Sequence, residues 1–479
     1  MKTFVASVVC CSLALTAVSD DATLMLDGDH FVTVAESSTQ TISAKVTGSG
    51  RIVLNGGGTL ILSNAENDFT GGIVVSNGII RADASGAFGT GTISLEGENK
   101  AHVRQIRLNA AKGVFANHVM LRLIETTGNV LYAMQSAEFR GDIHTWPEYT
   151  GSKYFICGTA SASVSVTFGG DIEVPYLRLE GKGKYICNGK VSVSGTLIAG
   201  NASEDYGHLT LANPGNEINQ LTVKAFRIYC RDKNVIFRST IFFDYNWHGN
   251  TAQRGCIFLE GFDQEFKVLN YRKENSYELL SRDDSCVTVF TPDDKPATVT
   301  LSGPGAAYGY CRLAGPVSMV IDLIKAEGAT MYQRFLYRYN SMGGDFTVKN
   351  GSCYFTEGVE FPSLVNYTHT GGTLNCENVT NCLRGLRNMV VSGGSVMFNS
   401  GCVDVTGART RLYLSSQAKF CCHSGLTNTV RNLYLDGRKM PAGIYTYENL
   451  LPMQHPTKID EYTGVIRVTH GPSFAIKVK

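Results

Sequence analysis

The stretch that decides the fold is residues 57–95, which read GGTLILSNAENDFTGGIVVSNGIIRADASGAFGTGTISL. Short apolar runs, such as Thr59–Leu62, Ile73–Val75 and Thr92–Leu95, are separated by glycine and asparagine. Runs of this length with a partly alternating pattern predict strands. Turn pairs such as Asn77-Gly78 supply the positive φ that tight corners need. The stretch therefore predicts short strands joined by tight corners.

The same pattern continues along the chain, for example in Ser163–Phe168, Val191–Val193 and Ser395–Phe398. Helical caps followed by long amphipathic runs are nearly absent. The best helical segment is Pro316 to Glu327, where apolar residues share a helical face. Its β-branched residues suit a strand equally well, so both alternatives stay open for this segment.

Glycine pairs followed by a strand-like run recur at residues 343, 371 and 393. Self-similarity at a period of about 20 to 50 residues is typical of repeat architectures, in which each unit buries its apolar face against its neighbours. Because the units here are strands without helices, we predict an all-β chain folded as a right-handed parallel β-helix. A pair of β-sandwich domains is the alternative.

The composition excludes several classes of function. The chain has 479 residues, with 43 Lys+Arg against 42 Asp+Glu and only 18% charged residues. Binding to nucleic acid requires a basic face that neutralises phosphates, and this balanced chain predicts none. A hydrophobic content of 43% also excludes a disordered chain. We therefore expect a folded protein without a nucleic-acid partner.

Residues 1–19 combine one lysine, an apolar run from Phe4 to Val18, and small residues before Asp20. This pattern is typical of a secretory signal peptide. No later segment is long and apolar enough to span a bilayer, so we expect an exported, secreted or cell-surface protein that does not span the membrane. The predicted organisation is a signal peptide at 1–19, a β-helix at 20–432 and a C-terminal capping segment at 433–479.

Two of the 14 cysteines fall in the expected leader, and twelve remain after it. This number is low for a disulfide scaffold, and no CxxC pair indicates a zinc site. Gaps such as Cys157 to Cys187 and Cys230 to Cys256 approach one coil of a β-helix, so ladders of stacked thiols, reduced or bridged, are one interpretation. Buried apolar thiols are the other.

Residues 57–95 resemble the autotransporter-associated β-strand repeat, also called the passenger-associated transport repeat. The matching positions are Gly58-Thr59-Leu60, Leu62, Asn67, Phe69-Thr70-Gly71-Gly72, Val75, Gly78 and Ala87-Phe88-Gly89-Thr90-Gly91. The resemblance implies that Leu60, Leu62, Phe69, Val75 and Ile79 point inward, while Gly71-Gly72 and Gly78 turn the corners. Proteins of this family are secreted bacterial β-helices, often the passengers of surface-displayed adhesins or toxins.

Members of this family commonly end in a β-barrel translocator, and we expect none in a chain that stops at Lys479. The tail at residues 433–446 is instead similar to the closing segment of secreted repeat proteins that lack the barrel. Asp436-Gly437 favours a two-residue hairpin turn. We expect this hairpin to cover the last coil, as an open-ended solenoid requires of its terminal unit.

Three segments place carboxylates and an imidazole within a few residues: Asp142/His144, Glu204-Asp205/His208 and Asp244/His248. Such groups could serve glycosidic cleavage by a lyase or hydrolase, which uses paired acids or a base beside a charge stabiliser. The competing interpretation is that these are solvated turn residues, in which an aspartate caps a corner amide.

The two tryptophans, Trp146 and Trp247, lie beside two of these segments, and Tyr245 is adjacent to the second. Exposed aromatic rings are good platforms for sugar rings or for a partner surface, whereas buried ones would only fill the core. We predict a non-enzymatic adhesion or structural protein that contacts a polysaccharide or a cell-surface protein through these residues, without a metal or cofactor. A carbohydrate-active enzyme is the alternative.

Overall fold

The computed structural model describes residues 3–4, 23–97, 102–123, 130–147, 154–200, 207–224, 226–244, 255–272, 287–292, 294–303, 306–309, 311–323, 332–335, 341–356, 359–453 and 459–472. Within these ranges the regular structure is β-strands plus two short 3-10 helices, Leu451–Met453 and Ile459–Glu461. The chain forms two compact units: unit 1 comprises residues 1–235 with 245–248, and unit 2 comprises residues 236–244 with 249–479.

Unit 1 stacks its strands in three columns. The first column contains β3 (Asp29–Thr33), β6 (Arg51–Asn55), β8 (Ile73–Val75), β10 (Ile93–Gly97), β13 (Val119–Leu123), β16 (Ile143–Thr145), β19 (Ile172–Val174) and the first parts of β22 (Val191–Ala199) and β24 (Glu217–Val223). The second contains β4 (Thr39–Ile42), β7 (Thr59–Leu62), β9 (Gly78–Ala82), β11 (Arg104–Leu108), β14 (Leu131–Ala133), β17 (Tyr154–Thr159), β20 (Tyr176–Glu180) and the later parts of β22 and β24. The third contains β12 (Gly113–Phe115), β15 (Ala137–Phe139), β18 (Ser165–Phe168), β21 (Lys184–Cys187), β23 (His208–Leu211) and β25 (Arg227–Cys230).

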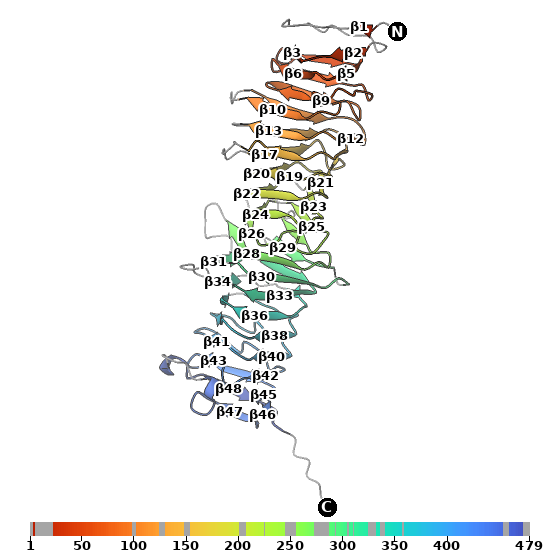
Figure 1. Cartoon of the computed structure of the whole chain (residues 1–479). Helices are drawn as coiled ribbons and strands as arrows, with labels where there is room; N and C mark the ends of the chain where they lie inside the picture. Colours follow the sequence, from red (N-terminus) through yellow and green to blue (C-terminus); the bar gives the residue numbers. More distant parts are fainter. Residues whose placement is uncertain are drawn as a thin grey trace, which may run out of the picture. The chain divides into compact units, whose positions relative to one another are not determined.

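All of these pairings are parallel and join successive coils, so the described part of unit 1 is a β-solenoid (Figure 1). This confirms the predicted all-β solenoid, and the sandwich alternative, which needs antiparallel sheets, is wrong. In Figure 1, β10, β13 and β17 follow one another in layers coloured orange to yellow. The coil length varies, from 19 residues between Ile172 and its partner Val191 to 29 between Ile143 and its partner Ile172.

The quoted stretch fills the core largely as expected. Leu60, Leu62, Phe69 and Val75 are fully buried. The expectation for Ile79 is wrong: β9 alternates from a buried Gly78, so Ile79 is half-buried and the following Ile80 points inward. The corner glycines Gly72 and Gly78 have positive φ, as the resemblance implied.

Buried asparagines bind backbone groups of the coils before and after them. The Asn67 side chain accepts a hydrogen bond from the Val46 amide (2.8 Å) and donates one to the Ala87 carbonyl (2.7 Å). Asn216 does the same between the Val191 amide and the Val235 carbonyl. A buried backbone group without a partner is costly, so these side chains supply the partners that the Val46 and Val191 amides need on the side of the next coil.

Unit 2 has the same parallel stacking. One column contains β28 (Gln264–Arg272), which also pairs with β26 (Ser239–Asp244), and then β30 (Ala297–Leu301), β33 (Val317–Asp322), β36 (Phe346–Asn350), β38 (Asn366–His369), β40 (Asn388–Val391), β42 (Arg411–Leu414) and β45 (Asn432–Leu435). Another contains β31 (Ala306–Gly309), β34 (Tyr332–Phe335), β37 (Ser352–Phe355), β39 (Thr373–Cys376), β41 (Ser395–Phe398) and β43 (Lys419–Cys422). The third contains β27 (Cys256–Phe258), β29 (Val287–Phe290), β32 (Cys311–Gly315) and β35 (Ser341–Met342).

Two open points of the sequence are settled in unit 2. The segment after Pro316 is the strand β33, which alternates buried and half-buried residues and so uses its β-branched side chains on a pleated surface. Two of the three glycine-pair repeats stack in register, with Leu374 of β39 against Val396 of β41. The first repeat leads into β36 of another column, where Phe346 pairs with Tyr367.

The last described strands of unit 2 include two antiparallel pairs. β46 (Arg438–Lys439) pairs antiparallel with β45 through a turn in which Asp436 and Gly437 both have positive φ, as a two-residue hairpin turn requires. β48 (Val465–Val468) pairs parallel with β44 (Thr427–Val430) and antiparallel with β47 (Gly443–Tyr445). The predicted hairpin is therefore present, while its role as a cap stays a prediction.

Ten cysteines of the described residues are free, and all but Cys256 are buried, which confirms the interpretation as buried apolar thiols. The alternative interpretation, a ladder of stacked thiols, is wrong for Cys157 and Cys187. Cys157 pairs with Leu179 in the second column, and Cys187 pairs with Leu211 in the third. Their gap resembles one coil only because coil lengths vary.

Of the predicted signal peptide, only Thr3–Phe4 belong to the described residues, as β1 paired parallel with β2 (Thr23–Leu26), which in turn pairs with β5 (Lys45–Gly48). The remainder of residues 1–19 lies outside them. In the ranges given above, no helix is long and apolar enough to cross a membrane.

Candidate functional site

The sequence-predicted pair Asp142 and His144 lies on the outer side of unit 1, at β16. Ile143 is buried in the core, so the residues on either side of it point away from the core. His144 stands in register with Met120 of β13 and with Glu173 of β19. Asp142 precedes the strand at the corner. The pair predicted from sequence is therefore joined by residues from the coils before and after it.

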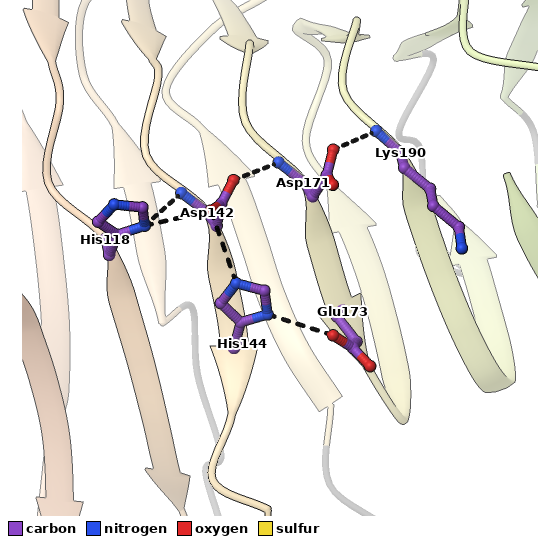
Figure 2. A network of polar contacts seen from close by, with 6 residues as sticks. All are labelled: His118, Asp142, His144, Asp171, Glu173 and Lys190. Carbon is purple, nitrogen blue, oxygen red and sulfur yellow. Dashed lines mark hydrogen bonds and ion pairs between the residues drawn. The ribbon is translucent and has the colours of Figure 1, made fainter. Parts of the chain in front are cut away.

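Figure 2 shows the resulting network. The His144 ring lies between two carboxylates, with Nε2 3.8 Å from Asp142 Oδ2 and Nδ1 3.4 Å from Glu173 Oε2. His118 of the preceding coil places its Nδ1 3.3 Å from Asp142 Oδ2. Two imidazoles and two carboxylates of three successive coils are thus brought together, although they lie as far apart in sequence as residues 118 and 173.

The same aspartate also has a structural task. Asp142 Oδ1 accepts a hydrogen bond from the Asp171 amide at 2.8 Å, and Asp171 Oδ1 accepts one from the Lys190 amide at 2.7 Å (Figure 2). The Asp142 amide in turn donates to His118 Nδ1 at 3.1 Å. Each side chain therefore caps the corner amide of a neighbouring coil, as the turn-residue interpretation of Asp142 expected.

The network is open to solvent. The exposed fractions of the side chains are 60% for His118, 36% for Asp142, 34% for His144 and 73% for Glu173. Ion pairs at this exposure contribute little to stability because water screens them. The same exposure leaves their donors and acceptors accessible to a ligand.

Trp146 continues the outer row of β16, two residues beyond His144. Its amide donates to the Leu121 carbonyl at 2.9 Å, which extends the ladder past the end of the strand. The side chain is half-buried rather than part of the core, and the Arg122 guanidinium carbon lies 5.5 Å from its ring centroid. This distance is within the range of a cation–π interaction, which holds the ring in place.

Most of the other predicted residues lie outside the described part of the chain. Tyr245, Trp247 and His248 lie outside the described residues, as do Glu204 and Asp205. Asp244 is the last residue of β26, and only its backbone is described. His208 lies in β23, in the third column. In the described part of the chain no group of three or more His, Cys, Asp or Glu residues could hold a metal ion.

The sequence did not indicate His118, Arg122 or Glu173. Each lies a full coil from Asp142 or Trp146, and the coils differ in length, so no fixed spacing would connect them. The sequence shows only that each short strand carries polar residues on its outward side. Which of them become neighbours depends on the register between strands.

Comparisons with known proteins give a limited likeness. No protein-family model matches the chain, and no solved structure matches it. The chain is 38% identical over 81 residues to the Adhesin BmaC autotransporter of Brucella suis biovar 1 (strain 1330), which is 17% of this chain and 2% of that protein. The chain thus matches only about 2% of the length of this relative. The weak likeness to an autotransporter adhesin, together with the parallel β-solenoid, fits an autotransporter-type β-helix passenger.

Proposed function

We propose that this protein is a secreted or cell-surface β-helical adhesion protein that contacts glycans and catalyses no reaction. The stretch similar to an autotransporter adhesin and the β-solenoid fold support the adhesive, structural part of this proposal. The signal-peptide pattern of residues 1–19 supports export. A polysaccharide or a surface glycoprotein would be the partner.

The observation that carries the glycan contact is the outer row of β16. Trp146 offers a half-exposed ring fixed by Arg122, and His144 lies two residues away on the same side of the chain. Sugars are bound by stacking of their apolar faces on aromatic rings while nearby polar groups bind the hydroxyls. Glu173 and His118 supply further exposed polar groups within the same network.

The hydrogen bonds of Asp142 support a non-enzymatic role. One carboxylate oxygen holds the Asp171 amide, and the other lies beside two imidazoles. A general acid or base must be able to exchange its proton with the substrate. A carboxylate that caps a corner of the fold is poorly placed to do so.

Binding of the intact protein to a panel of immobilised polysaccharides tests the proposal. We expect Trp146→Ala to weaken binding to the recognised glycan about tenfold, because a stacked ring is lost. Tyr132→Ala, which removes a half-buried aromatic from β14 in the second column, is the matched control and should bind as the wild type does. Equal binding by Trp146→Ala and the wild type would contradict the proposed contact.

The alternative is a carbohydrate-active enzyme, a polysaccharide lyase or glycoside hydrolase. It is favoured by one observation: Asp142 and Glu173 both lie beside His144, so two carboxylates converge on the outer face. Release of reducing ends or unsaturated sugars from the same polysaccharides would support this alternative. Loss of that release in Glu173→Gln would place the site at β19, and loss in Asp244→Asn would place it at β26.

A further inference from the structure

A second polar surface lies on the third column of unit 1, on strands that the Trp146 face does not use. The first residues of β21, β23 and β25 are Lys184, His208 and Arg227, and they stack in register. Adjacent strands are about 4.8 Å apart, so three basic side chains stand one above another at that spacing. Lys184 and Arg227 are exposed and His208 is half-buried.

These basic residues lack a compensating acid among the described residues. No carboxylate of the described ranges pairs with Lys184 or Arg227. The pKa of His208 is lowered by burial first, and then by the positive charges of Arg227 and Lys184. The lowered pKa favours the neutral form of His208, so the positive charges of this column are those of Lys184 and Arg227, on the strands to either side.

Two other outer arginines of unit 1 are each paired with an acid. Arg51 forms a bidentate pair with Asp29, and Arg140 pairs with Glu138 at 2.8 Å. In a chain with 43 basic and 42 acidic side chains, opposite charges are available for pairing. Lys184 and Arg227, which pair with no carboxylate of the described residues, therefore form a local excess of positive charge on either side of His208.

An aromatic ring lies in the middle of this surface. Tyr229 is two residues beyond Arg227 on β25 and faces outward in register with Thr210. Its ring contacts the ring of His208 at a centroid distance of 5.5 Å with the planes tilted by 43°, and the Arg231 guanidinium carbon lies 6.0 Å from its centroid. Residues 227, 229 and 231 share one side of the chain, so two arginines flank the ring along the strand.

We propose that this surface, defined by Lys184, His208, Arg227, Tyr229 and Arg231, binds an acidic polysaccharide that carries carboxylate or sulfate groups. The positive charges of Lys184 and Arg227 match a polymer that carries repeated negative charges, and Tyr229 offers a face for a sugar ring. Duplex nucleic acid fits less well, because its affinity depends on neutralising many phosphates and the cationic area here is small.

The experiment measures binding of the full chain to polygalacturonate and to dextran sulfate, with neutral dextran as the uncharged control, by isothermal titration calorimetry. We expect one or both acidic polymers to bind, and the affinity to fall between about 50 mM and about 200 mM salt as ions are displaced. Neutral dextran should not bind to this surface. Absence of binding by both acidic polymers at low salt would overturn the proposal.

Variants locate the site. Lys184→Gln with Arg227→Gln should weaken binding about tenfold and make it less sensitive to salt, since two charge contacts are lost. The matched control, Arg51→Gln with Arg140→Gln, also removes two positive charges, but from residues that are already paired, and should change the affinity less than about twofold. Equal losses in both double variants would show a general charge effect and contradict the site.

The chemical class of the ligand is tested by Tyr229→Leu and by competitors of equal charge. The substitution should weaken binding of the acidic polysaccharide and leave weak binding of polyglutamate unchanged, because only the sugar stacks on the ring. Tighter binding of polyglutamate or duplex DNA than of either acidic polysaccharide would overturn the assignment to a glycan. Trp146→Ala should retain binding of the acidic polymers, which separates this surface from the function proposed above.

Discussion

The corner at Gly72 gives a sharp test of how tightly successive coils are packed. Gly72 has a φ of +82°, and a Cβ added there would lie well inside van der Waals contact of the Thr92 carbonyl oxygen on the next coil. Gly28, also in unit 1, has a φ of +76°, and a Cβ there would meet nothing within 4 Å. The two glycines therefore share backbone strain and differ in the contact with the neighbouring coil.

The difference between Gly72→Ala and Gly28→Ala isolates that contact. A positive φ costs a residue with a Cβ about 1 to 2 kcal/mol at either position. The clash with Thr92 adds about 1 to 3 kcal/mol, as overpacking in a tightly packed interior does. We expect Gly28→Ala to lower the free energy of unfolding by about 1 kcal/mol and Gly72→Ala to lower it by about 3 kcal/mol.

Urea unfolding followed by circular dichroism measures both values, with the wild type and both variants compared at equal protein concentration. A change in midpoint without a change in the denaturant slope would show that stability has changed and the folded state has not. If the two variants differed by less than about 0.5 kcal/mol, the close stacking of Gly72 on the next coil would be refuted.

Three further predictions follow from buried or crowded polar groups. Asn67→Leu should destabilise unit 1 by about 2 to 4 kcal/mol in urea unfolding, because two buried backbone groups lose their partner. Burial lowers the pKa of His369 to about 4 in the folded state. The unfolded state binds a proton at this side chain below about pH 6.5, whereas the folded state binds it only below about pH 4. Unit 2 should therefore lose about 3 kcal/mol of stability as the pH falls from 6.5 to 4, a loss absent in His369→Phe and measurable by urea unfolding at several pH values. Arg227→Gln should raise the pKa of His208 in an NMR titration, since one of the charges that lower it is removed; an unchanged pKa would contradict the stacking of these side chains.

The local elements of the fold could be predicted from sequence. Thr59–Leu62, Ile73–Val75 and Ser395–Phe398 were expected as strands and occur with the same bounds, because short apolar runs between glycines have few other solutions. The column to which each strand belongs could not be predicted. The glycine pairs at 343 and 371 look alike but lead into strands of different columns.

The candidate site, too, could be predicted only where its residues are close in sequence. Asp142, His144 and Trp146 are neighbours in sequence, so one segment was enough to indicate them. Their partners His118 and Glu173 are brought in by the register between coils of unequal length. The surface on the third column could not be predicted for the same reason, since only the register places Lys184 and Arg227 on either side of His208.

The central claim is parallel, in-register stacking of successive coils, and paired cysteine substitutions test it most directly. Arg107 of β11 and Tyr132 of β14 are register partners on half-buried positions, so their Cα atoms fall within disulfide reach. Arg107→Cys with Tyr132→Cys should form a disulfide under mild oxidation, detected by mass spectrometry of the unreduced digest. Gln105→Cys with Tyr132→Cys, displaced by two residues, should not. A crosslink in the displaced pair and none in the register pair would contradict the solenoid.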